Sequence, residues 1–174
     1  MSTEILQRRA IFFDRDGTLN VEKHFLIDPA EFEWIDGAID AIKFCNEHDF
    51  LTIVITNQSG IARGFFSEID VQNLHAWMNS ELKKQNAHID DFFYCPHHPE
   101  AVVEKYRLDC DCRKPKSGLF EQACRKYSID RKNSLMIGDS DRDVESAENF
   151  GIRGIKFASG NLFDTLKQVL FEKN

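Results

Sequence analysis

Two carboxylates one residue apart follow the first apolar segment of the chain. Residues 10–13, Ala-Ile-Phe-Phe, lead into Asp14, Arg15, Asp16 and Gly17. A short apolar run bounded by polar residues is typical of a buried strand of a parallel sheet. Because side chains alternate along an extended backbone, we expect Asp14 and Asp16 on the same side at the carboxyl end of this strand. Ligands bind at that edge of open α/β sheets, so the pair predicts a site there.

Two further apolar segments also end in polar groups. Residues 51–55 are rich in β-branched side chains, which favours a strand. The residues that follow it are Thr56, Asn57, Gln58, Ser59 and Gly60. A hydroxyl, two amides and a glycine-containing turn suit phosphate oxygens. Residues 135–137 form another apolar run, which ends at Gly138 and Asp139, with Asp143 shortly after.

Three of the five cysteines and a histidine are grouped around one polar loop. The candidate ligands are Cys95, His97, Cys110 and Cys112. Two tight pairs of thiolate and imidazole ligands separated by a loop are typical of a structural zinc site, which binds four such groups tetrahedrally. His98 is a rival ligand that spacing alone does not exclude. Arg113 and Lys114 directly follow the last cysteine, so a metal-bound loop would hold two cations in place.

Segments with helical periodicity separate the predicted strands. We expect helices over residues 37–48, 67–86, 118–127, 144–150 and 161–171, and further strands over 92–94 and 154–157. This alternation predicts an α/β fold with a doubly wound parallel sheet of the Rossmann type. With 174 residues and no interdomain linker, the chain is expected to form a single domain over residues 1–174. No large insertion precedes the second strand, so we expect no large cap domain.

The chain is acidic, with a formal net charge of -7 and a pI near 5.4. This charge disfavours nucleic acid or an anionic membrane as a partner, and an anionic ligand would need a local cluster of donors. The first residues lack the apolar core of a signal peptide, and no run is long enough to span a bilayer, which favours a cytoplasmic protein. In that compartment the cysteines are expected as thiols or metal ligands.

Four ordered motifs resemble those of the haloacid dehalogenase-like phosphatases. They are Asp14-x-Asp16-Gly17-Thr18, Thr56 after a strand, Lys114, and Gly138-Asp139 followed by Asp143. The resemblance implies a Mg²⁺-dependent phosphatase in which Asp14 attacks phosphorus and Asp16 donates and then accepts a proton. The implied Mg²⁺ ligands are Asp14, the backbone carbonyl of Asp16, and Asp139. The groups implied to hold the transferring oxygens are Thr56, Asn57 and Lys114.

The same resemblance implies a substrate site beside these motifs. Its expected residues are Glu22, Lys23, His24, Phe25, Asn57, Gln58, Ser59 and Arg113. The Cys/His loop is similar to that of family members that hydrolyse a heptose bisphosphate, whereas the histidinol-phosphate phosphatases have a shorter loop than residues 98–109 here. The implied partner is therefore a small-molecule sugar bisphosphate, and the implied protein is a monomer with catalytic Mg²⁺ and structural Zn²⁺.

Three other interpretations remain open at this point, besides a histidinol-phosphate phosphatase. A zinc-stabilised module could bind a phosphorylated ligand without hydrolysing it, and would show Mg²⁺-independent binding and no phosphate release. A receiver-like phosphoacceptor domain also has an acidic pair, a Thr and a Lys at strand ends, but its acidic pair and acceptor Asp lie on different strands. A polynucleotide phosphatase would need a basic stripe that this chain lacks. Two alternatives are open for the acids after Asp139: Asp141 and Asp143 cap the helix that follows, or Asp143 orients the metal shell. Ser140 has no assigned role.

Overall fold

The computed structural model describes residues 7–171, which form a five-stranded parallel sheet with the strand order β3-β2-β1-β4-β5. The strands are β1 (Ala10–Phe13), β2 (Leu51–Asn57), β3 (Asp91–Cys95), β4 (Leu135–Gly138) and β5 (Arg153–Lys156). The chain adds β2 and β3 on one side of the central β1 and then crosses to add β4 and β5 on the other. The predicted doubly wound sheet is confirmed, and its direction of winding reverses between β1 and β4, where ligands bind in such folds.

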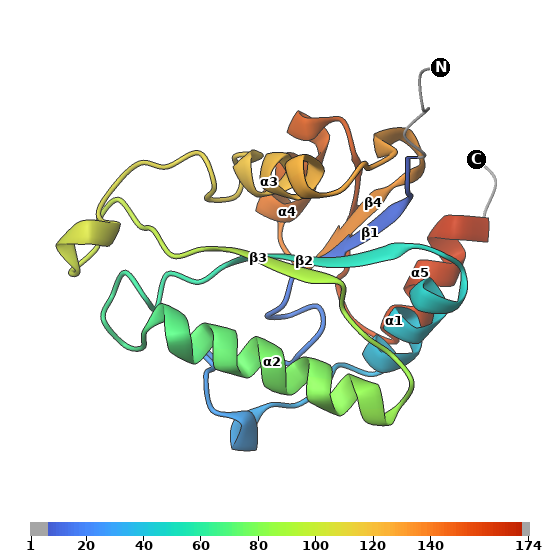
Figure 1. The fold of residues 1–174 in the computed structure, drawn as a ribbon, viewed down its shortest axis with the longest axis horizontal. Coiled ribbons are helices and arrows are strands. Elements are labelled where there is room, and N and C mark those ends of the chain that lie inside the picture. Colours follow the sequence, from blue (N-terminus) through green and yellow to red (C-terminus); the bar gives the residue numbers. More distant parts are fainter. Residues whose placement is uncertain (1–6, 172–174) are drawn as a thin grey trace.

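Helices cover both faces of this sheet. They are α1 (Ala38–Glu47), α2 (Glu68–Lys84), α3 (Gly118–Lys126), α4 (Asp141–Phe150) and α5 (Leu162–Phe171). Figure 1 shows α3 and α4 on one face and α1, α2 and α5 on the other. Alternation along β1 supplies both cores: Phe12 packs edge-on against Phe120 of α3 at a centroid distance of 4.9 Å, while Ile11 and Phe13 join the core on the face of α1.

Capping side chains explain where two of the helices begin. Ser67 caps α2, and the Asp70 carboxylate accepts a hydrogen bond from the backbone of Ser67 in return. Ser140 and Asp143 form the same reciprocal box at the start of α4. Because of this box, α4 begins at Asp141 rather than at residue 144 as predicted. All five predicted helices and all five predicted strands are present, with bounds shifted by a few residues.

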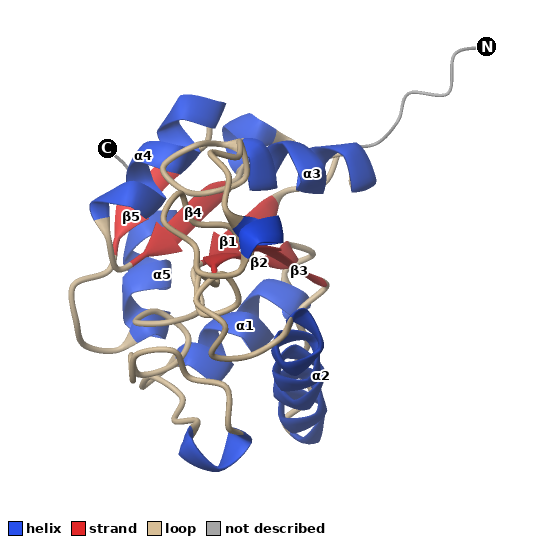
Figure 2. Cartoon of the chain, turned by 90° about the vertical axis from the view of Figure 1, so that its left-hand side faces the viewer, coloured by secondary structure: helices blue, strands red, loops and turns tan. Residues whose placement is uncertain are grey.

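Two long loops lie at the carboxyl ends of the strands, where Figure 2 shows them in front of the sheet. We call residues 14–37, between β1 and α1, the flap loop; it contains only a short 3-10 helix at Pro29–Glu31. Residues 96–117, between β3 and α3, form the second loop, with a 3-10 helix at Glu104–Tyr106. Within residues 7–171 neither loop carries a large cap domain, as predicted. None of the helices in this range has the length and apolar character needed to cross a bilayer.

Candidate active site

The register of the sheet brings the three polar strand ends together. Phe13, the last residue of β1, lies opposite Val54 of β2 and Ile137 of β4. The backbone N–H of Asp14 donates to the carbonyl of Ile137 at 3.0 Å, which holds Asp14 at the edge where β4 ends. Thr56, near the end of β2, and Asp139, directly after β4, lie at the same edge, and both line one cavity of about 120 Å³ together with Asp14.

Lys114 lies at the centre of this edge and is almost completely buried. Its Nζ is 2.9 Å from Oδ1 of Asp14 and 2.6 Å from Oδ1 of Asp143, and it donates to the carbonyl oxygen of Ile55 at 2.8 Å. Burial alone would lower the pKa of Lys114, but Asp14 and Asp143 raise it above its ordinary value. The ammonium is therefore charged and fixed beside the Asp14 carboxylate.

Asp14 is a carboxylate in a site with a surplus of negative charge. Burial raises the pKa of Asp14 to about 7, Lys114 lowers it, and Asp143 and Asp16 raise it. Burial, followed by Asp143, also raises the pKa of Asp139. One ammonium thus faces several carboxylates, and a further cation would relieve their repulsion.

The residues present fit a magnesium ion. Carboxylate oxygens of Asp14, Asp139 and Asp143 lie within 4.8 Å of one another, and oxygen ligands are those that Mg²⁺ prefers. Gly17 has φ +81° and lets Asp139 approach, because a Cβ at Gly17 would lie 2.2 Å from Oδ2 of Asp139. Asp143 is already engaged, since its Oδ2 accepts hydrogen bonds from the Ser140 backbone and hydroxyl while Oδ1 meets Lys114. Oδ1 of Asp14 also meets Lys114, so Asp139 and the other oxygen of Asp14 are the carboxylate groups best placed to hold the ion.

Asp16 lines the same cavity as Asp14, although β1 ends at Phe13 and the turn at Gly17, rather than strand alternation, sets its place. Its carboxylate accepts hydrogen bonds from Arg15, Asn20 Nδ2 at 3.1 Å and Gln58 Nε2 at 2.8 Å. Burial raises the pKa of Asp16, but Arg15 and these amides outweigh burial and hold it below its ordinary value.

The end of β2 contributes a hydroxyl to the cavity and an amide that fixes Lys114. The buried Thr56 hydroxyl accepts a hydrogen bond from Gln58 Nε2 at 3.0 Å. Asn57 binds the backbone of Lys114 on both sides: Nδ2 donates to its carbonyl at 3.1 Å, and Oδ1 accepts from its N–H at 3.0 Å. Asn57 lines the cavity, and its amide is what ties the loop after β3 to the catalytic edge.

A second cavity of about 140 Å³ adjoins the first and shares Asp16, Glu22 and Asn57 with it. Its other lining residues are His24, Phe25, Gln58 and Ser59. These are residues predicted for the substrate site. Lys23 lines neither cavity, because its Nζ donates to the carbonyl of Glu31 at 2.7 Å within the flap loop.

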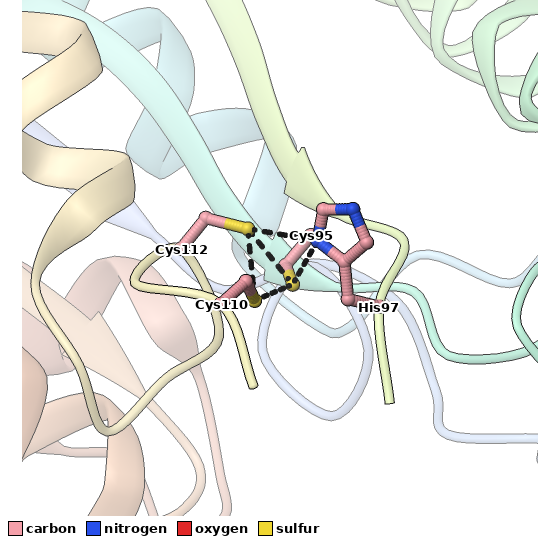
Figure 3. A group of neighbouring side chains, drawn as sticks. All are labelled: Cys95, His97, Cys110 and Cys112. Atoms are coloured by element: carbon pink, nitrogen blue, oxygen red, sulfur yellow. Dashed lines mark hydrogen bonds between the residues drawn. The ribbon is translucent and has the colours of Figure 1, made fainter. Parts of the chain in front are cut away.

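Four side chains meet at one point in the loop after β3 (Figure 3). Sulfur–sulfur distances are 3.4 Å for Cys95–Cys110, 3.1 Å for Cys95–Cys112 and 3.3 Å for Cys110–Cys112. Nδ1 of His97 lies 3.3 Å from the Cys112 sulfur. Two thiolates bound to one zinc ion are separated by about 3.8 Å, so the cluster has nearly the spacing of a tetrahedral zinc site.

The cluster also resolves which histidine faces the thiols. His98 points elsewhere: its Nδ1 accepts a hydrogen bond from the backbone of Glu100 at 3.1 Å. The hydrogen bond with Cys95 lowers the pKa of Cys112 to about 5, which favours its thiolate, the form that binds zinc. Three sulfurs and one imidazole form the donor set that zinc prefers, so the residues fit this ion as well.

Arg113 directly follows Cys112 of the Cys/His cluster. Its NH1 donates to the carbonyl of His97 at 3.3 Å. Burial lowers the pKa of Arg113, and the like charges of Arg142 and Arg63 lower it further. Arg142 itself lines the catalytic cavity. Arg113, predicted for the substrate site, lines neither cavity; we call Arg113 and Arg142 together the cationic rim.

Sequence reasoning missed several residues at this edge. Arg15 pairs with Asp16, and Asp143 fixes Lys114, but neither received that role from its residue type. Arg15 carried a usable signal, because it is a cation between two acids directly after a buried strand. His75, which contacts Arg15, occupies an apolar position of α2 at helical spacing from Val71, Met78 and Leu82.

Comparison with known proteins identifies the class of protein to which this site belongs. The model of HAD-hydrolase-like proteins matches residues 111–168, so the fold and the site define a haloacid dehalogenase-like hydrolase. A D-glycero-β-D-manno-heptose-1,7-bisphosphate 7-phosphatase of Rhodopseudomonas palustris is 41% identical to this chain, over 99% of the chain and 96% of the relative. The enzyme of the same name from Haemophilus influenzae is 45% identical over 79% of this chain and 74% of the relative. The chain belongs to the family of heptose-1,7-bisphosphate 7-phosphatases.

A solved structure supports the same placement. The D,D-heptose 1,7-bisphosphate phosphatase from B. bronchiseptica, determined with magnesium and phosphate, superposes with a TM-score of 0.77 and is 32% identical. The match covers 92% of this chain and 86% of the other.

Proposed function

We propose that this protein is a Mg²⁺-dependent phosphatase that removes the 7-phosphate of D-glycero-D-manno-heptose 1,7-bisphosphate through an aspartyl-phosphate on Asp14. The observation that carries the proposal is the convergence of Asp14, Lys114 and Asp139 at one cavity at the reversal point of the sheet. Family membership supports the substrate, since relatives along most of the chain are named for this reaction.

In the first displacement, an oxygen of Asp14 attacks phosphorus while the bond between phosphorus and the sugar oxygen breaks. In the free site Arg15 favours the ionised form of Asp16, but the negative charge of a phosphate bound beside it favours uptake of a proton. Asp16 then gives this proton to the leaving sugar oxygen, which departs as a neutral hydroxyl. In the second displacement, water attacks phosphorus and passes a proton to Asp16, and the bond to Asp14 breaks. Inorganic phosphate leaves, and both carboxyl groups return to their starting states.

The surrounding groups act mainly by charge and position. The Lys114 ammonium and the Thr56 hydroxyl lie where they can stabilise the negative charge that spreads over the transferring oxygens. Asp143 and Asn57 hold Lys114 from its side chain and from its backbone. Mg²⁺, when bound by Asp14, the Asp16 carbonyl and Asp139, would offset the repulsion between the nucleophile and the phosphate.

We further propose that Cys95, His97, Cys110 and Cys112 bind a structural zinc ion. All four positions of a tetrahedral ion would be filled by protein atoms, which leaves none for water. The ion would stiffen the loop that presents Arg113 and Lys114. Arg113, with Arg63 and Arg142 nearby, would hold the phosphate that does not react, since a guanidinium fork suits phosphate oxygens.

The proposal also covers the domain organisation, oligomeric state, cellular compartment and substrate class of the protein. Residues 1–174 would form one domain that acts as a cytoplasmic monomer on a small molecule. The five free cysteines support a reducing compartment, because thiolate ligands persist there. The net charge of -7 supports a small substrate over nucleic acid, since only the local cationic rim attracts anions.

Phosphate release with purified protein and Mg²⁺ tests the function. We expect the wild type to prefer heptose 1,7-bisphosphate over fructose bisphosphate and histidinol phosphate. Asp14→Asn should lower the rate more than about a thousandfold while zinc content and folding stay unchanged. Asp141→Asn is the matched control, because this exposed carboxylate pairs with Lys156 outside the cavity. Full activity of Asp14→Asn, or a clear preference for histidinol phosphate, would refute the proposal.

A further inference from the structure

Arg15 is fully buried between the two acidic residues of the first motif. Its guanidinium contacts three segments besides its neighbour Asp16. NH2 lies 3.1 Å from the carbonyl oxygen of Leu26 in the flap loop and 3.2 Å from Oε1 of Gln58 after β2. NH1 lies 3.5 Å from Nε2 of His75 on α2. A single side chain thus joins the flap loop and the segment after β2 to α2.

The Nε–NH2 side of the Arg15 guanidinium contacts the Asp16 carboxylate and fixes the orientation of the carboxylate plane. Nε and NH2 of Arg15 lie 3.2 Å and 3.0 Å from Oδ1 of Asp16, and NH2 lies 2.9 Å from Oδ2. Gln58 completes the ring, because its Nε2 donates to Oδ2 at 2.8 Å while its Oε1 faces Arg15. A planar guanidinium held against a carboxylate sets direction as well as distance.

Arg15 is itself held by the core. His75, its partner on α2, is 5% exposed and stacks on Phe92 of β3, with ring centroids 4.2 Å apart and an angle of 13°. A buried ion pair adds little net stability, because the loss of hydration offsets the attraction. What this pair adds instead is a fixed orientation for Asp16.

We propose that Arg15 is a positioning residue for the acid of the reaction: it orients the Asp16 carboxyl group toward the sugar oxygen and couples that orientation to Leu26 of the flap loop and to Gln58. This inference rests on the proposed function, in which Asp16 protonates the leaving group. Arg15 touches neither the cavity over Asp14 nor the cavity beside it, so it acts only through Asp16, Gln58 and the flap loop.

The test compares two leaving groups. A sugar alkoxide needs a proton to depart, whereas p-nitrophenolate departs without one. Arg15→Gln should lower kcat/KM, which reports the steps through departure of the leaving group, about 10- to 100-fold for heptose 1,7-bisphosphate and much less for p-nitrophenyl phosphate. Hydrolysis of the aspartyl-phosphate, in which Asp16 is the base with either substrate, does not enter kcat/KM. Arg15→Lys should recover part of the loss. Added to Asp16→Asn, Arg15→Gln should cause no further loss. Arg125→Gln, an exposed arginine on α3, is the matched control and should change neither rate.

Equal losses with both substrates, or additive losses in the double variant, would overturn the proposal and leave Arg15 a structural residue. If Arg15→Gln does not fold, Gln58→Leu removes one of the bonds that orient Asp16 and should give a smaller loss with the same dependence on the leaving group. Equal losses in Gln58→Leu would overturn it as well. Failure of the proposed function is recognised separately, since wild-type protein would then release no phosphate from the heptose bisphosphate.

Discussion

The protonation state of Lys114 depends on the two carboxylates that contact it. Without Asp14 and Asp143, burial would favour the neutral amine; with both carboxylates at 2.9 Å and 2.6 Å, the charged form is retained. Asp143 is in turn held by the Ser140 hydroxyl and backbone. Asp143 therefore acts on the reaction through Lys114 and not as a further proton donor.

A second prediction at the scale of single residues concerns Arg113. Arg113→Met should raise KM for heptose 1,7-bisphosphate about 10-fold or more, because a charged hydrogen bond to the retained phosphate contributes about 1.5–3 kcal/mol. kcat should change little. Steady-state kinetics with the bisphosphate and with a sugar monophosphate that lacks the second phosphate measure the difference. Arg125→Met on α3 serves as the control. An equal rise in KM for both substrates would contradict a role in binding the second phosphate.

The sequence predicted the chemistry-bearing residues better than it predicted their partners. Asp14, Thr56 and Asp139 each end an apolar run, and chain geometry then carries all three to one edge. Arg15 and Asp143 gain their roles from contacts with Asp16 and Lys114, and sequence distance does not encode such contacts. The family resemblance predicted Lys23 at the substrate site, but a backbone carbonyl of the flap loop binds its ammonium.

At the scale of elements, the loop after β3 connects the Cys/His cluster to the edge of the sheet that carries Asp14. Cys95 is the last residue of β3, and β3 pairs with β2, so one ligand is anchored in the sheet beside Asn57. The remaining ligands lie in the loop itself, which returns along Arg113 and Lys114 to the catalytic edge. Order in this loop is thus expected to depend on the ion more than on packing.

Cys110→Ala tests that dependence. We expect zinc content to fall below about half an equivalent per chain, and KM for the bisphosphate to rise, because three ligands hold the ion weakly and leave Arg113 less fixed. Elemental analysis of the purified protein measures the first and steady-state kinetics the second. Cys124→Ala removes a thiol on α3 outside the cluster and should keep its zinc. Full zinc occupancy in Cys110→Ala would show that the ligands are wrongly assigned.

His75 on α2 makes the stability of the fold depend on pH. Burial, then the charge of Arg15, lower its pKa to about 3, against 6.5 for the free side chain. As pH falls below 6.5, the unfolded chain binds a proton that the folded chain does not, so stability is lost on acidification until the folded pKa is reached. Between about pH 7 and about pH 5 this costs about 2 kcal/mol.

Urea unfolding of wild type and His75→Gln at the two pH values checks this dependence. The groups that face His75 are Arg15 after β1, with Asp16 behind it, and Tyr94 beside Phe92 on β3; all of them remain in the variant. Wild type should lose about 2 kcal/mol more than His75→Gln on acidification. Equal losses in the two proteins would mean that His75 does not titrate as its burial implies.

Element bounds followed the sequence closely where a local signal existed. Gly151, with φ 83°, ends α4 as its glycine suggested, and Ser67 begins α2. The start of α4 was placed too late, because the apolar residues of that helix begin at Val144 while its first turn is made of capping acids. Hydrophobic periodicity indicates the buried face of a helix, but it does not indicate a first turn whose side chains are polar.

At the scale of the whole molecule, an acidic protein must attract an anionic substrate. The carboxylates needed for nucleophilic attack add to the net charge of -7, so attraction depends on the few cations at the carboxyl edge and on the bound metal. The sheet topology makes this possible by bringing β1, β2 and β4 to one crevice. Among residues 7–171 only loops cover this crevice, so the proposal assigns the selection of substrates to the cationic rim.

The most direct test of this account is to trap the covalent intermediate. A single turnover of heptose 1,7-bisphosphate with Mg²⁺ would be stopped with acid, and the digested protein examined by mass spectrometry. The account predicts one phosphoryl group on the peptide that contains Asp14, localised to that residue and absent from Asp14→Asn. Phosphate release without any phosphoryl-enzyme in rapid-quench samples, or a phosphoryl group on another residue, would contradict it.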